Sequence, residues 1–66
     1  MAKILLEKIL NEREITYRQA ELMTGIPKST LLDIAHGKSD PRLSTLEQIA
    51  EGLKINITDL FESRYK

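Results

Sequence analysis

The stretch YRQAELMTGIPKSTLLDIAHG, residues 17–37, constrains the fold of this chain more than any other part of it. It contains two helix-length segments that meet at Gly25. Glycine readily adopts a positive φ, so Gly25 can end the first helix. Pro27 can start the second, because the first helical position needs no amide donor. The sequence therefore predicts two short helices, over about 17–24 and 27–36, joined by a turn of about three residues.

Two apolar stripes with the spacing of a helix face flank this stretch: Leu5, Leu6, Ile9 and Leu10 before it, and Leu43, Leu46, Ile49, Ala50 and Leu53 after it. They predict helices over about 2–12 and 44–53. A short fifth helix is expected over about 57–62, with Ile57, Leu60 and Phe61 on its buried face. No segment shows the alternation of a strand, so the sequence predicts an all-α, five-helix domain that occupies residues 1–66.

Three pairs of residues have the spacing of a capping box, in which each side chain accepts a hydrogen bond from the other residue's amide. The pairs are Thr16 with Gln19, Ser44 with Glu47, and Asn56 with Asp59. Each pair precedes an apolar stripe, so each is expected to start a helix. Gly37 is expected to end the third helix, and Lys54 to adopt a left-handed conformation in a tight turn.

Composition limits the classes of function. A chain of 66 residues forms one small domain, and with no cysteine it has neither disulfides nor thiolate metal ligands. No apolar run approaches the roughly 20 residues that span a bilayer, and the N-terminus lacks the long apolar region of a signal peptide. His36 is the single histidine, without an evident catalytic or metal-binding partner. We therefore expect a cytoplasmic protein that is not an enzyme and has no cofactor, metal ion, small-molecule ligand or membrane partner.

Charge is balanced over the whole chain, with ten basic and ten acidic residues. Residues 15–42 carry four bases and three acids, a net charge of +1, whereas residues 43–66 carry three bases and four acids. The four bases of the middle segment are Arg18, Lys28, Lys38 and Arg42. A nucleic-acid partner is usually met by a basic surface, so the arrangement of these four bases matters more than the total.

The run TYRQAELMTGIPKSTLLDIAHGKSDPRLSTLEQIAEGLKINITDLFE resembles the phage-repressor and Cro type of helix-turn-helix domain, the XRE family. Its most specific parts are TGIPKSTL, IAHGKSDPRLSTLEQIAEGL and INITDLF, and the likeness extends from Leu5 to about Glu62. The resemblance implies a compact lambda-repressor-like fold with the helix-turn-helix at helices 2 and 3. It also implies that helix 3 lies in the major groove of double-stranded DNA.

The same resemblance implies two groups of contact residues. Those expected to reach base edges are Lys28, Ser29, Thr30, Leu32 and Asp33. Those expected to reach phosphates are Tyr17, Arg18, Lys38, Ser39 and Arg42. Together they predict a sequence-specific transcriptional regulator, acting as a homodimeric repressor on a palindromic operator. The residues expected at the dimer interface are Ile57, Phe61 and Tyr65.

Two positions depart from the family pattern. Tyr17 stands where glutamine is common, and Glu21 stands where a small residue usually lies buried between helices 2 and 3. Either helix 2 is rotated slightly, or Glu21 points outward or pairs with a base such as Arg18. The weakly charged third helix also leaves a second function open, a protein-interaction module of this fold, antitoxin-like or regulatory, that binds DNA weakly or not at all.

Overall fold

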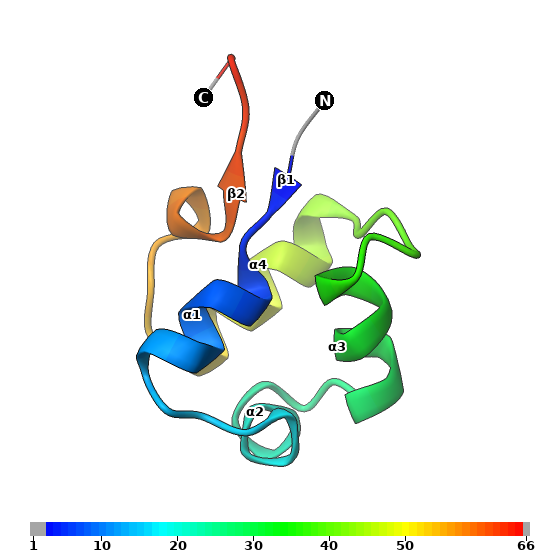
Figure 1. Ribbon diagram of the computed structural model, residues 1–66, viewed down its shortest axis with the longest axis vertical. Helices are drawn as coiled ribbons and strands as arrows, with labels where there is room; N and C mark the ends of the chain where they lie inside the picture. Colours follow the sequence, from blue (N-terminus) through cyan, green and yellow to red (C-terminus); the bar gives the residue numbers. More distant parts are fainter. Residues whose placement is uncertain (1–2, 66) are drawn as a thin grey trace.

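The structure, a computed structural model, describes residues 3–65. Within them lie four α-helices, one 3-10 helix and a pair of two-residue strands (Figure 1). Their order is β1 (Lys3–Ile4), α1 (Leu6–Glu12), α2 (Tyr17–Thr24), α3 (Lys28–Ala35), α4 (Leu43–Leu53), η1 (Ile57–Leu60) and β2 (Phe61–Glu62). The fold is mostly helical, and α2, the turn after it and α3 occupy the predicted stretch.

The two ends of this fold correct the predicted count of five helices, although the domain keeps the all-α class. Strand β1 pairs antiparallel with β2, with Ile4 opposite Phe61, and the Leu5 amide donates to the Leu60 carbonyl at 2.7 Å. The helix predicted over 2–12 begins only at residue 6, residue 2 being outside the described part. The helix predicted over 57–62 is a single 3-10 turn followed by a strand. Pairing between segments so distant in sequence leaves no local periodic signal.

Local capping signals have mixed outcomes. Thr16 and Gln19 form the predicted capping box, with hydrogen bonds of 3.0 and 2.9 Å at the start of α2. The box predicted at Ser44 is wrong: α4 starts at Leu43, one residue earlier, and its N-cap residue makes no side-chain hydrogen bond. In η1 the Asp59 carboxylate accepts from the Asn56 amide at 3.2 Å.

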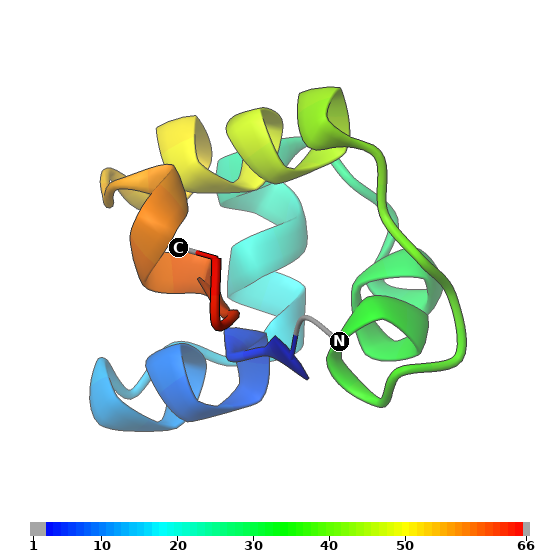
Figure 2. The same cartoon turned by 90° about the horizontal axis from the view of Figure 1, so that it is seen from above.

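The core lies where the helices converge, and helix α4 lies across α2 with η1 and α3 on either side (Figure 2). The buried apolar residues come from all of the helices and the α2–α3 turn: Leu6, Ile9, Leu10, Ala20, Ile26, Leu31, Ile34, Leu46, Ile49, Ala50, Leu53 and Leu60. At the start of the turn after α4, Lys54 adopts the predicted left-handed conformation, with φ of 58°.

Helices α2 and α4 approach each other closely at Gly52. A Cβ at this position would lie 2.6 Å from the Met23 carbonyl oxygen and 2.7 Å from Thr24 Cα, so only glycine fits without a shift. Beside it, Gln48 Nε2 donates to the Thr24 carbonyl at 2.8 Å. These contacts hold the carboxyl end of α2, where the turn to α3 begins.

Candidate nucleic-acid interface

A tight turn sets the direction of α3 relative to α2. Gly25 has φ of 76° and donates its amide to the Glu21 carbonyl at 2.8 Å, as a left-handed C-cap. The buried Thr24 hydroxyl donates to the Ala20 carbonyl at 2.7 Å and accepts from the Ile26 amide at 3.2 Å. Because the buried Ile26 side chain anchors the turn in the core, the two helices are joined without a flexible loop.

Helix α3 has one buried and one exposed face. Leu31 and Ile34 are buried in the core. The side chains predicted to reach bases lie on the other face, exposed except for the half-buried Leu32: Lys28, Ser29, Thr30, Leu32 and Asp33. The helix ends with a Schellman arrangement, in which the Gly37 amide donates to the backbone carbonyl of Ile34 and the Lys38 amide donates to the backbone carbonyl of Asp33.

The start of α3 is capped by a residue of the preceding helix. Pro27 is the N-cap residue rather than the first helical residue, and it makes no side-chain hydrogen bond. Instead, Glu21 Oε1 accepts from the Lys28 amide at 3.0 Å. The residue buried between α2 and α3 is Ala20, which has no exposed surface. Of the alternatives that the sequence left for Glu21, none included this hydrogen bond, and the only signal for it was the lack of a capping side chain at Pro27.

The exposed bases lie near both ends of α3. Arg18 and Lys28 line one shallow surface pocket of about 250 Å³, together with Glu21 and Leu22. At the other end of the helix, a broader groove is lined by residues 34–40, including Lys38 and Ser39, and by β1. Three of the five predicted phosphate-binding residues thus lie near the ends of α3, with Arg18 at one end and Lys38 and Ser39 at the other. Arg42 lines neither pocket and lies exposed just before α4.

A family model described as Helix-turn-helix matches residues 6–60. The chain belongs to this helix-turn-helix family. The match covers all four α-helices and η1, and it confirms the XRE/Cro type that the sequence resembles. No curated protein matches the chain significantly.

One predicted DNA contact of this helix-turn-helix protein does not fit the structure. The Tyr17 hydroxyl is buried and has no hydrogen-bond partner among the described residues, so it does not face a phosphate. Burial raises the pKa of Tyr17 above its ordinary value of 10.0, and the negative charge of Glu7 raises it further. The phenol belongs to the packing of α2, a role that its sequence position gives no means of predicting.

The three residues predicted at a dimer interface do not lie on one shared helix. Ile57 is half-buried in η1, Phe61 is half-buried in β2, and Tyr65 is 87% exposed. Phe61 was expected in a helix, and its place in a strand corrects that expectation. Tyr65 is the most exposed large apolar side chain in the described part of the chain.

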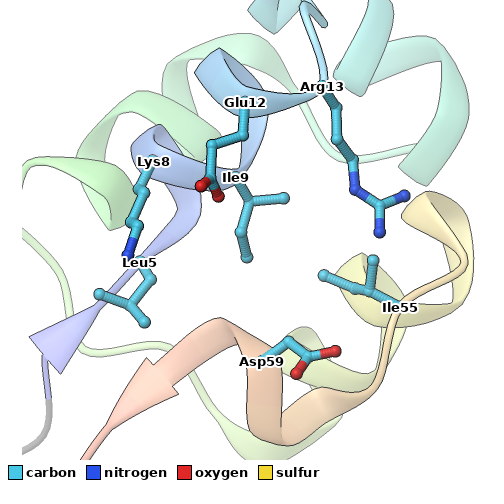
Figure 3. Close-up of a pocket in the computed structure, with 7 residues that line it drawn as sticks. All are labelled: Leu5, Lys8, Ile9, Glu12, Arg13, Ile55 and Asp59. Carbon is cyan, nitrogen blue, oxygen red and sulfur yellow. The ribbon is translucent and has the colours of Figure 1, made fainter.

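A third hollow, of about 270 Å³, lies away from α3, between α1 and the segment 55–59 (Figure 3). Ile9 and Ile55 face each other across it, with Arg13 and Asp59 at its edges. Arg13 donates to the Leu53 carbonyl at 3.4 Å, so it links α1 to α4. Among residues 3–65 no helix is long and apolar enough to cross a membrane, and no group of three side chains is placed to hold a metal ion.

Proposed function

We propose that this helix-turn-helix protein is a transcriptional regulator that binds double-stranded DNA in a sequence-specific manner, with α3 in the major groove. The observation that carries the proposal is the exposed polar face of α3 with exposed bases near both of its ends. Membership of a family of DNA-binding regulatory domains supports the same function.

The side chains on that face suit base recognition. Lys28 can donate to guanine O6 and N7, Ser29 and Thr30 can donate or accept, and the half-buried Leu32 can contact a thymine methyl. Asp33 can accept from cytosine N4, whereas its charge repels phosphates. We assign the phosphate contacts to Arg18, Lys38, Ser39 and Arg42, all of which are exposed.

We further propose that the protein binds as a homodimer and acts as a repressor at a palindromic operator. The support is Tyr65, an aromatic side chain that the monomer leaves almost fully exposed and that follows the half-buried Ile57 and Phe61 in the sequence. A twofold dimer would place two α3 helices about 34 Å apart, one turn of B-DNA. The additional buried surface would also stabilise a domain with a small core.

Selection of bound duplexes from a random pool tests both proposals. We expect a palindromic motif, and we expect Lys28→Ala to lose preference at one position of each half-site, at a cost of about 1–3 kcal/mol. Lys8→Ala is the matched control, because Lys8 is exposed on α1 beside the hollow of Figure 3. If no motif is enriched at any salt concentration, the DNA-binding proposal fails; a single unrepeated half-site would contradict the dimer alone.

A second candidate function, a protein-interaction module, is favoured by one observation. Leu22 is 80% exposed and lines the same pocket as Lys28, so an apolar side chain lies beside the start of α3. A protein partner would bury it, whereas DNA phosphates would not. Affinity capture with wild-type protein and with Leu22→Ser distinguishes the functions: loss of a stoichiometric protein partner in Leu22→Ser supports this candidate, and selective DNA binding by both forms opposes it.

A further inference from the structure

The cap of α3 depends on a carboxylate from α2. The first amides of a helix have no partners within it, and Pro27 has no side-chain oxygen to accept from them. Glu21, seven residues before Lys28, supplies the acceptor at 3.0 Å. Since α2 is itself fixed to α4 by the Gln48 hydrogen bond and the close contact at Gly52, the first turn of α3 is tied through Glu21 to the rigid part of the fold.

This position matters because the first turn carries the side chains assigned to base edges. Lys28, Ser29 and Thr30 all lie within three residues of the hydrogen bond. Recognition of a base requires donors and acceptors to be placed within a few tenths of an ångström and a few tens of degrees. A loose first turn would still meet phosphates, but it would distinguish base edges less well.

The charge of Glu21 acts on the same surface in another way. The carboxylate shares a shallow pocket with Arg18 and Lys28, so it offsets part of their positive charge. Binding to DNA of any sequence is driven almost entirely by such charge. A negative group at this place therefore weakens attraction to all DNA without regard to sequence.

We propose that Glu21 is a positioning residue with two separable effects: its oxygen holds α3 for base discrimination, and its charge limits affinity for DNA of any sequence. The inference rests on the proposed DNA-binding function. It explains why a residue larger and more polar than the family usually has at this position can stand beside the recognition helix.

The test compares Glu21→Gln, which keeps an acceptor oxygen and removes the charge, with Glu21→Ala, which removes both. Glu51→Gln is the control, because Glu51 is exposed on α4 and lines none of these pockets. Affinities are measured for the selected operator and for a scrambled duplex of equal length. We expect Glu21→Gln to raise both affinities by about threefold at low salt and to keep their ratio. We expect Glu21→Ala to raise binding to the scrambled duplex similarly, while the ratio falls by about tenfold.

Hydrogen exchange of the Lys28 amide in the free protein gives a readout that needs no DNA. Exchange should become faster than in the wild-type protein in Glu21→Ala and should keep about the wild-type rate in Glu21→Gln. Should Glu21→Ala not fold, Glu21→Leu removes the oxygens while keeping a long side chain on α2. If wild-type protein selects an operator and the variant without oxygens keeps the wild-type ratio, the positioning role is overturned. If wild-type protein binds no duplex, the proposed function itself fails, and the exchange rates still report on the cap.

Discussion

At the scale of single residues, two polar side chains of α2 have roles that differ from those expected of their positions. The Tyr17 hydroxyl, expected to donate to a phosphate, is buried without a partner among residues 3–65. Glu21, expected to point outward or to pair with a base such as Arg18 unless helix 2 is rotated slightly, caps α3. The role of Tyr17 is decided by burial of its hydroxyl in the interior, and the role of Glu21 by the Lys28 amide of the next helix.

The buried phenol leads to a prediction about stability and pH. Tyr17→Phe removes an unpaired buried hydroxyl, so we expect it to raise the free energy of unfolding, by up to about 1 kcal/mol, without weakening DNA binding. Because the pKa of Tyr17 is raised in the folded state, the unfolded chain releases the proton first. The wild-type protein should therefore lose stability as pH rises through about 10, and Tyr17→Phe should lose less.

Urea unfolding between pH 8 and pH 11 measures this effect. Tyr65→Phe serves as the control, because the Tyr65 side chain is almost fully exposed. An equal loss of stability in Tyr17→Phe and wild-type protein would contradict the assignment, and so would a weaker affinity of Tyr17→Phe for the operator.

At the scale of elements, similar local sequences have different outcomes because the chain around them differs. Thr16 and Ser44 each precede an apolar stripe and have glutamine or glutamate three residues later. Thr16 caps α2, whereas Ser44 lies within α4, which starts at Leu43 after Arg42. Because the N-cap residue of α4 is Arg42, two residues before Ser44, Ser44 is an ordinary position within the first turn of the helix.

This difference predicts unequal effects of the same substitution type. Thr16→Ala should destabilise the domain by about 1 kcal/mol, since it removes the acceptor for the Gln19 amide. Ser44→Ala should change stability by less than about 0.5 kcal/mol, since no cap is lost. Thermal and urea unfolding of the two variants give the comparison directly. A larger loss in Ser44→Ala than in Thr16→Ala would show that α4 starts at Ser44 in solution.

At the scale of the whole molecule, zero net charge limits how strongly DNA can be attracted. The ten basic and ten acidic residues balance, and the bases assigned to phosphates are only Arg18, Lys38 and Arg42. Most of the attraction must therefore come from a few positions around α3 rather than from a basic domain.

The dependence of DNA affinity on salt follows from this arrangement. With three such bases per protomer, the logarithm of affinity should fall with the logarithm of salt concentration with a slope of about 3 per protomer. Arg18→Ala should lower that slope by about 1, whereas Lys8→Ala, a base on α1 outside the proposed interface, should leave it unchanged. DNA-binding isotherms of the wild-type protein and the two variants between 50 and 200 mM salt measure these slopes. An unchanged slope in Arg18→Ala would remove this residue from the interface.

The sequence alone determined the helix-turn-helix, the family, the four α-helices to within a few residues, and the exposed polar face of α3. These features depend on apolar spacing, glycine and capping residues, which act over a few positions along the chain. Only the tertiary structure decided the β1–β2 pairing, the burial of the Tyr17 hydroxyl and the cap that Glu21 gives to α3. Each of these depends on groups from different elements meeting in space, and the sequence pattern within one element does not carry that information.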